Sequence, residues 1–192
     1  MRILKLFILL LNFSLSAQEA INVINTESST LNWVGKKITT SQHNGSLKFL
    51  SGELTICANN NGSESLVCGG KFSVDMTSLL VEDLTGSSKQ RLEGHLKSDD
   101  FFSVNKHKTA YLSINSSKAT DSGFIAQGSL TIKDITHPIE FKLTRSLGGF
   151  VADLVFDRSK YNVRYNSGSF FENLGDNLIL DEIELTANLY FQ

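Results

Sequence analysis

The 192-residue chain is short of proline, cysteine and clustered positive charge. It has one proline and two cysteines, and its 18 basic residues, set against 20 acidic ones, form no basic block. A protein without such a block is poorly suited to bind nucleic acid, or to attach to anionic lipid by charge alone. No segment beyond the N-terminus is apolar for long enough to span a membrane.

The N-terminal segment 1–17 has the composition of a secretory signal peptide. Arg2 and Lys5 give it a positive start, residues 6–15 form an apolar run, and small residues precede a cleavage point after residue 16 or 17. The run is too short to cross a bilayer, and no cysteine at the cut offers a lipid anchor. A frayed N-terminal helix is the alternative. We therefore expect 18–192 to be one exported domain, with periplasmic localisation.

The sequence also lacks the signatures of common catalytic sites. It has no G-x-S-x-G motif and no glycine-rich phosphate loop. The histidines His43, His95, His107 and His137 are spread along the chain, and no spacing singles out a serine, histidine and acid set. Metal binding by His43 and His95 is not favoured without further ligands. We expect no catalytic residue, no catalytic cofactor and no metal, so the protein is not expected to be an enzyme.

The two cysteines, Cys57 and Cys68, flank a polar stretch typical of a loop. Each lies at the end of a strand-like run, so an oxidising compartment favours a disulfide that closes a hairpin. A pair of free thiols is the alternative. Metal binding by the two cysteines is not favoured, because no histidine or third cysteine lies nearby at ligand spacing.

What the sequence has in abundance is alternation of apolar and polar residues. In 123–145, two alternating runs flank a short connection at residues 134–136, and Pro138 lies near the start of the second run, where a missing N–H is tolerated. A period of two predicts strands with one buried face. The apolar faces of this predicted hairpin comprise Phe124, Ala126, Leu130, Ile132, Ile139, Phe141 and Leu143.

The same pattern predicts eight strands in all, at 31–38, 46–57, 69–76, 109–117, 123–133, 137–145, 149–157 and 178–191. A short helix is predicted at 87–97, where Ser87 and Gln90 have the spacing of a capping box. The tripeptide 43–45, His-Asn-Gly, is read as a turn. The apolar phase shifts across Gly52, which predicts a bulge or bend there.

Eight antiparallel strands and one helix predict an all-β protein whose sheet closes into a barrel, since closure removes the exposed edges. A barrel of this size holds either a packed core or one small ligand. The 13 phenylalanines suit both arrangements.

An ordered set of short motifs then resembles a known family. The motifs are Trp33-x-Gly35, His43-x-Gly45, Gly52, Gly69-Gly70-x-Phe72-x-Val74-Asp75-Met76, His95-Leu96, Asp100-Phe101-Phe102, Gly128-x-Leu130-Thr131-Ile132, Thr136-x-Pro138-Ile139-x-Phe141 and Asp157-Arg158-Ser159. Together they resemble the YceI-like family of bacterial periplasmic proteins over nearly the whole of 18–192. Residues 106–108 depart from the pattern, since relatives often carry Tyr-Pro there, and the cysteine pair is not general in the family.

The resemblance implies a lipocalin-like antiparallel eight-stranded β-barrel with one short helix inserted between strands. It also implies a long apolar cavity that holds a polyisoprenoid, either an isoprenoid quinone or a prenyl pyrophosphate. The candidate ligand-binding residues are Trp33, His43, Phe49, Phe72, Val74, His95, Leu112, Ile114, Leu130, Ile132, Phe141, Leu154 and Phe156.

Several polar residues have two possible roles. His43 and His95 could contact a lipid head group at the cavity mouth, or satisfy backbone groups in loops. Asp75 and Arg158 are read as a buried ion pair or backbone clamp rather than as ligand contacts. Residues 161–165 could supply a polar lid through Tyr161, Arg164 and Tyr165, or form a solvated loop.

The expected function is that of a periplasmic carrier or reservoir for an isoprenoid lipid, and a link to stress is a further expectation. Its partners would be the lipid and, transiently, a membrane, with no nucleic acid, and the protein would be a monomer or homodimer. Two alternatives remain open. One is a solid-core barrel that acts as a structural or interaction module without lipid. The other is an enzyme in which His95 or His43 lies beside a carboxylate in a pocket.

Overall fold

A computed structural model describes residues 19–58 and 65–192 of the protein. The expected signal peptide at 1–17 lies outside the described residues. The described elements are β1 (Glu19–Val23), β2 (Thr30–Lys37), β3 (Gln42–Ala58), β4 (Ser65–Val81), α1 (Gly86–Lys97), β5 (Thr109–Thr120), β6 (Gly123–Ile132), β7 (Ile135–Ser146), β8 (Gly149–Asp157), the 3-10 turns η1 (Arg158–Tyr161) and η2 (Gly175–Asn177), and β9 (Ile179–Tyr190).

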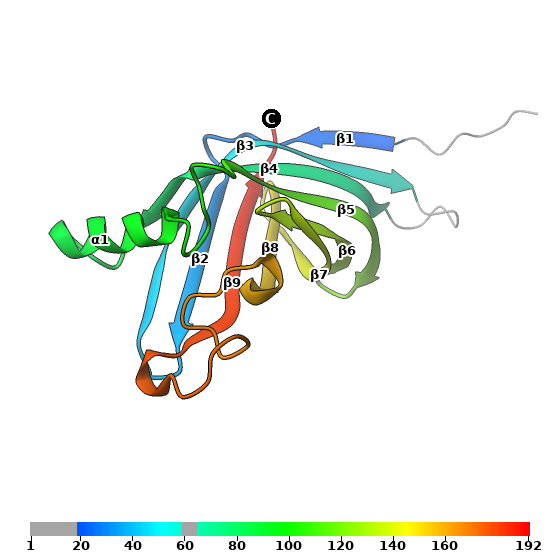
Figure 1. Ribbon diagram of the computed structural model, residues 1–192. Helices are drawn as coiled ribbons and strands as arrows, with labels where there is room; N and C mark the ends of the chain where they lie inside the picture. Colours follow the sequence, from blue (N-terminus) through cyan, green and yellow to red (C-terminus); the bar gives the residue numbers. More distant parts are fainter. Residues whose placement is uncertain (1–18, 59–64) are drawn as a thin grey trace, which may run out of the picture.

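Strands β2 to β9 form a closed antiparallel barrel (Figure 1). Going round the ring, the order is β3, β2, β9, β8, β7, β6, β5 and β4, and the pairing of β3 with β4 closes it. The predicted all-β barrel of eight strands with one helix is therefore confirmed. Helix α1 follows β4 and projects from one end of the barrel, whereas the C-terminus lies at the opposite end.

The hairpin predicted from the alternation in 123–145 is formed by β6 and β7. Phe124, Leu130 and Leu143 are buried on the inward face, as the period of two requires. The connection is one position earlier than predicted. Lys133 and Asp134 make it, with φ values of 52° and 61°, which matches the two-residue type I′ turn that suits the twist of a hairpin.

The predicted irregularity near Gly52 is present but begins earlier in β3. The register against β4 shifts between Phe49 and Ser51, so Phe49 and Leu54 face inward while Leu50 is 54% exposed. Gly52 has a separate role, because a Cβ there would lie 2.6 Å from the Phe72 ring. The bulge therefore changes which face points inward, and the glycine admits a large ring beside it.

The predicted turn at 43–45 is wrong, because these residues belong to β3 and the chain reverses at 38–41 instead. Gly45 is needed for close packing: a Cβ there would lie 1.8 Å from the carbonyl oxygen of Leu80 and 2.8 Å from the Trp33 ring. The indole Nε1 of Trp33 donates to that same Leu80 oxygen at 3.2 Å. A glycine that signals a turn in sequence is here a site of close strand contact.

The predicted capping box is also wrong. Helix α1 begins at Gly86, one residue earlier than expected. Its N-cap is Thr85, Ser87 lies inside the helix, and no side chain caps that end. At its C-terminal end Leu96 is buried against the barrel, while Phe101 and Phe102 pack edge to face just beyond it. These contacts, rather than a cap, hold the helix in place.

Strand β1 was not predicted. It pairs with the second half of β3, beyond the part of β3 that pairs with β2. Ile24, just after β1, is 1% exposed and contacts the end of β9 through a bridge to Phe191. The five residues of β1 alternate only weakly between apolar and polar, so the sequence pattern does not predict a strand there.

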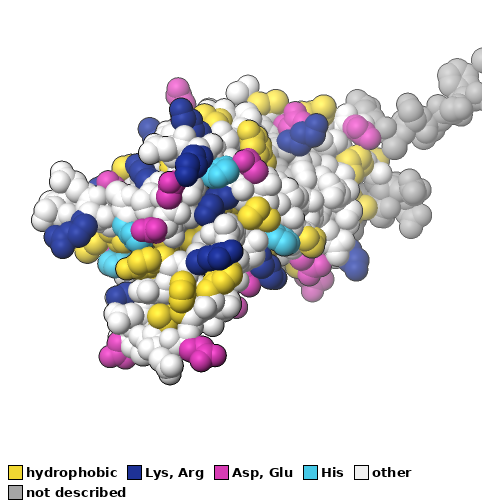
Figure 2. Space-filling model, viewed as in Figure 1, with side chains coloured by type: hydrophobic (Ala, Val, Ile, Leu, Met, Phe, Trp, Pro, Cys, Tyr) yellow, Lys and Arg dark blue, Asp and Glu magenta, His cyan; other side chains and the backbone are white. Residues whose placement is uncertain are grey.

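The described residues include no helix long and apolar enough to cross a membrane. Basic and acidic side chains are interspersed over the face shown in Figure 2, which agrees with the lack of a basic block in the sequence.

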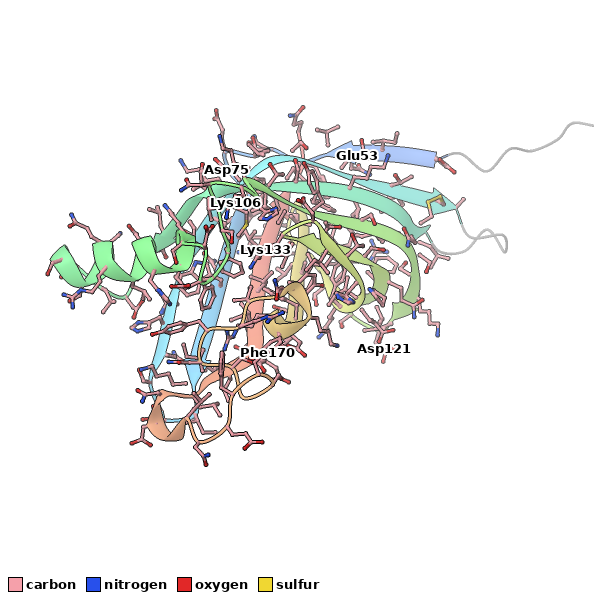
Figure 3. The ribbon with its side chains drawn as sticks, viewed as in Figure 1. Glu53, Asp75, Lys106, Asp121, Lys133 and Phe170 are labelled. Carbon is pink, nitrogen blue, oxygen red and sulfur yellow. A yellow bond between two sulfur atoms is a disulfide. The ribbon has the colours of Figure 1, made fainter. Side chains whose placement is uncertain are left out.

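The predicted disulfide joins Cys57 and Cys68, whose Cα atoms lie 5.9 Å apart. It ties together β3 and β4 near the tip of their hairpin, at the end of the barrel away from α1 (Figure 3). A crosslink at that place holds the two strands that close the ring.

We predict that replacing both cysteines with serine lowers the free energy of unfolding by about 3 kcal/mol, because the crosslink restricts a short loop of the unfolded chain. Urea denaturation of the oxidised protein and of the Cys57→Ser/Cys68→Ser variant measures the difference. An unchanged denaturation midpoint in the variant would contradict a structural role for the disulfide.

Candidate functional site

The barrel encloses a cavity of about 400 Å³. This lies within the range of roughly 300–1,000 Å³ typical of small-molecule sites. Its wall is made of inward-facing aliphatic and aromatic side chains from all eight strands of the ring, β2 to β9. They include Leu31, Leu47, Met76, Leu79, Ala110, Leu143, Ala152, Ile183, Leu185, Ala187 and Leu189, besides those predicted from sequence.

One end of the cavity is closed by packed apolar side chains. Phe124 and Phe150 have ring centroids 6.0 Å apart, and Phe191, which is bridged to the almost fully buried Ile24, lies 6.1 Å from Phe150. The Arg145 guanidinium covers this plug from outside, 4.7 Å above the Phe124 ring. The cavity therefore has a blind end.

The other end of the cavity, near α1, is polar. Its rim carries Lys36, Lys37, Ser41, Gln42, His43, His95, Tyr165, Asn166 and Asn177. Along β9 the lining runs from Ile179 at this mouth to Leu189 at depth, ten residue steps or roughly 33 Å of strand. The shape is thus a long apolar tube with one polar opening.

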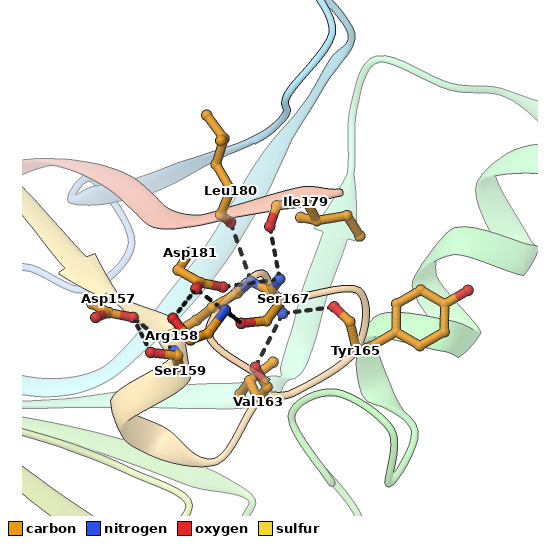
Figure 4. A network of polar contacts seen from close by, with 10 residues as sticks. Asp157, Arg158, Ser159, Val163, Tyr165, Ser167, Ile179, Leu180 and Asp181 are labelled. Carbon is orange, nitrogen blue, oxygen red and sulfur yellow. Dashed lines mark hydrogen bonds and ion pairs between the residues drawn. The ribbon is translucent and has the colours of Figure 1, made fainter. Parts of the chain in front are cut away.

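The mouth is shaped by the buried side chain of Arg158, which is 0% exposed (Figure 4). Its Nη1 donates to the carbonyl oxygens of Val163 and Tyr165 at 3.1 and 3.0 Å. Its Nε and Nη2 donate to those of Leu180 and Ile179 at 3.2 and 3.1 Å. One guanidinium therefore fastens the loop after η1 to the first residues of β9.

The charge of Arg158 is balanced by Asp181, whose Oδ1 lies 3.2 Å from Nη2. The other oxygen of Asp181 accepts hydrogen bonds from the hydroxyls of Ser167 and Ser169 at 2.9 and 2.7 Å. Burial lowers the pKa of the Arg158 guanidinium, and the carboxylates of Asp181 and Asp157 oppose that shift. Because an arginine stays protonated in proteins, the ion pair persists.

The prediction that Arg158 forms an ion pair or backbone clamp is confirmed, but its partner is not Asp75. The Asp75 carboxylate instead accepts from the amide and hydroxyl of Thr77, at 2.8 and 2.6 Å. Asp75 therefore stabilises β4 where its register against β3 shifts, and it does not line the cavity or its mouth.

A second positively charged side chain, Lys133, also holds segments together at the barrel mouth. Lys133, in the β6–β7 turn, donates to the carbonyl oxygens of Phe101 and Asn162 at 3.0 and 2.9 Å (Figure 3). Burial lowers the pKa of the Lys133 ammonium. The segment after α1 and the loop after η1 are thus held against the barrel rim by one side chain.

His95 lies on α1 and faces the mouth. Its ring contacts that of Tyr165 edge to face, with centroids 4.3 Å apart, and lies 5.8 Å from that of Phe101. The His95 Nε2 atom is buried and has no hydrogen-bond partner among the described residues. A buried imidazole nitrogen without a partner is uncommon, so it is available to a ligand polar group at the mouth.

His43 is already engaged. Its Nδ1 lies 2.7 Å from Oδ2 of Asp83, and the amide of Asn44 donates to the other oxygen at 3.1 Å. Partial burial raises the pKa of the Asp83 carboxyl, but these hydrogen bonds outweigh it and leave the pKa below its usual value. With Nδ1 bound to Asp83, only Nε2 of His43 is left to meet a ligand.

All thirteen candidate ligand-binding residues lie on the cavity wall or its mouth. Contact between them and a ligand remains a prediction. Of the possible lid residues, Tyr165 lines the mouth, whereas Tyr161 is 2% exposed and packs its ring on Phe156. Arg164 lies on the surface of the loop, over Phe170.

Sequence reasoning missed other lining residues. Ile183, Leu185 and Ala187 belong to a strand whose alternation was recognised, so the same pattern would have identified them. Asn166 and Asn177 lie in irregular segments with no periodicity, and their position at the mouth depends on the Arg158 contacts far along the chain.

A closed eight-stranded antiparallel barrel with an apolar blind cavity, one polar mouth and one inserted helix defines a lipocalin-like binding barrel. Within that class, the sequence model of the YceI-like domain matches residues 23–191, so the chain belongs to the YceI-like family. Comparison with curated proteins finds no match.

Solved structures with the same fold include BcnA of Burkholderia cenocepacia, at a TM-score of 0.58 and 14% identity, covering 86% of this chain and 98% of that one. A polyisoprenoid binding domain from Saccharophagus degradans, implicated in plant cell wall breakdown, has a TM-score of 0.53 and 12% identity over 90% and 97%. The YCEI protein of Campylobacter jejuni has a TM-score of 0.50 and 16% identity over 75% and 84%.

We predict that Arg158→Lys lowers the free energy of unfolding by roughly 2–4 kcal/mol, because an ammonium with three donors cannot replace a guanidinium with five and leaves buried carbonyls unpaired. Thermal or urea unfolding of this variant, with exposed Lys160→Met as the control, measures the loss. Equal stability of the two variants would show that the clamp is not needed.

Proposed function

We propose that the protein holds a polyisoprenoid lipid in the barrel cavity and acts as its carrier or reservoir. The observation that supports this most directly is the shape of the site: a blind apolar tube with a single polar mouth fits a molecule with a long hydrocarbon tail and a small polar head. Membership of the YceI-like family and the fold shared with a polyisoprenoid binding domain support the same assignment.

The affinity would come mainly from the tail. Each methylene moved from water to the cavity contributes about 0.8 kcal/mol, so a five-carbon isoprene unit contributes on the order of 3–4 kcal/mol before ordering is subtracted. One hydrogen bond to the head group contributes about 1 kcal/mol net. The tail therefore sets binding strength, and the mouth residues select and orient the head.

The head group would meet His95, His43 and Lys37 at the mouth. Lys36 also lies at the rim, but Glu184 binds its ammonium. Imidazole and ammonium donors suit the oxygens of either a quinone or a pyrophosphate. Both classes of isoprenoid thus remain within the proposal.

A binding role without turnover fits the polar residues better than catalysis does. The pair of His43 and Asp83 is the arrangement that an enzyme would need. Among the described residues, however, no hydroxyl or thiol forms a hydrogen bond with His43, so the pair has no nucleophile to activate. We assign it the role of positioning the imidazole at the mouth.

We place this function in the periplasm. The signal-peptide composition of 1–17 and the disulfide in the described barrel support export to an oxidising compartment.

Native mass spectrometry of protein purified from bacterial periplasm without detergent tests the proposal. We expect a copurified isoprenoid, or uptake of an added one, as a discrete mass increase. Absence of any bound isoprenoid after both routes would refute it.

Filling the cavity tests where the lipid binds. Ala152 and Ala187 are cross-strand partners that both line the cavity, so Ala152→Trp or Ala187→Trp would occupy the path of the tail. We expect isoprenoid binding to weaken by at least about a hundredfold, since losing the burial of one isoprene unit, about 3–4 kcal/mol, already amounts to that.

The matched control is Val155→Trp, because Val155 lies on the same strand but is 49% exposed on the outer face. Its affinity should equal that of the unmodified protein in the same titration. Similar losses in the inner and outer variants, or no loss in either, would mean that the lipid does not occupy the cavity.

A further inference from the structure

The loops around the mouth expose an unusual set of apolar side chains. Among the described residues, twelve large hydrophobic side chains are exposed, and the two phenylalanines among them are neighbours, Phe170 at 40% and Phe171 at 50%. Tyr165 on the same loop is 41% exposed, and Ile38 in the β2–β3 turn is 57% exposed. We name these four residues the mouth patch.

The mouth patch is continuous with the cavity. The backbone amide of Ile38 donates to the carbonyl oxygen of Leu178 at 3.0 Å, so the two loops are joined. The amides of Phe170 and Phe171 both donate to the carbonyl oxygen of Ser167, next to Asn166, which lines the mouth. Anything that covers the mouth patch therefore also faces the opening.

The chemistry of the patch is that of a membrane interface. The Arg164 guanidinium lies 4.9 Å above the Phe170 ring, and Figure 2 shows hydrophobic and basic side chains together over the loop where Figure 3 labels Phe170. Aromatic rings beside basic side chains are favoured at the boundary between lipid head groups and acyl chains. Lys37 at the mouth adds positive charge, while Glu172 and Asp176 in the segment that follows Phe171 oppose it.

We propose that the mouth patch docks onto a phospholipid bilayer and so brings the cavity opening against the membrane. This rests on the proposed function, because a polyisoprenoid carrier must take its ligand from a lipid phase. The bilayer is favoured over a protein partner since the patch borders the opening through which that ligand would pass. The mixed charge of the loop makes insertion of the rings, rather than attraction to anionic lipid, the main source of binding.

The experiment measures binding of the full mature chain to vesicles of phosphatidylethanolamine, with and without phosphatidylglycerol and without any isoprenoid. We expect Phe170→Ser/Phe171→Ser to reduce partitioning by at least about tenfold, since two aromatic rings no longer enter the interface. Binding of the unmodified protein should persist when salt is raised from about 0.1 M to about 1 M.

The matched control is Leu147→Ser. Leu147 is 98% exposed in the turn between β7 and β8, at the blind end of the barrel, so its loss should leave partitioning unchanged. An equal loss in both variants, no binding by the unmodified protein, or binding abolished by salt would each overturn the proposal.

A second pair of variants reports the orientation without removing apolar surface. Phe170 and Tyr190 are equally exposed, at 40%, but lie at opposite ends of the barrel. In Phe170→Trp, brominated lipid should quench the added fluorescence, and in Tyr190→Trp it should not. Quenching at position 190 alone would show that the other end docks.

Uptake of geranylgeraniol added from ethanol separates this proposal from the proposed function. If Phe170→Ser/Phe171→Ser takes up the alcohol normally but no longer binds vesicles, both proposals stand. If the unmodified protein takes up the alcohol but does not bind vesicles, docking fails alone. If it binds vesicles but takes up no isoprenoid, the carrier function fails and docking stands by itself.

Discussion

The structure depends most on one buried guanidinium at the barrel mouth. Arg158 binds four backbone carbonyl oxygens from two segments and pairs with Asp181, so its hydrogen-bonding capacity is used inside the protein. Its Cζ also lies 5.3 Å from the Phe101 ring, which in turn contacts His95. Removing this charge would leave several buried carbonyls unpaired at once. The position of Tyr165, and with it the shape of the opening, follows from this single residue.

The second constraint is the apolar cavity behind that opening, of about 400 Å³. Side chains that line such a cavity lack the dispersion contacts that a close-packed core would give them, so the cavity lowers the stability of the barrel. A sequence that places alanines at 152 and 187, where larger side chains would fill the gap, keeps the space at the expense of stability. The proposed hydrocarbon tail would supply those contacts when it is bound.

Much of the fold could be predicted from the sequence because strands with one buried face repeat every two residues. That period identified the eight strands of the ring and the inward positions from Trp33 to Phe156, since burial alone decides them. Prediction from the sequence failed where contacts between distant segments, rather than burial of one face, decide the structure. Gly45 signalled a turn but serves a close contact with Leu80, and Ser87 had the spacing of a cap but lies within α1. At the mouth, His43, His95 and Tyr165 were candidates from sequence, but Asn166 and Asn177 were not, because Arg158 joins segments whose proximity only the closed barrel creates.

The measurement that tests the central claim most directly is an experimental electron-density map of the protein purified from periplasm without detergent. The account predicts continuous tubular density that runs from the mouth beside His95 to the blind end at Phe124, with a polar end within hydrogen-bonding distance of the His95 Nε2 atom. A cavity that has collapsed, or that contains only ordered water, would contradict it.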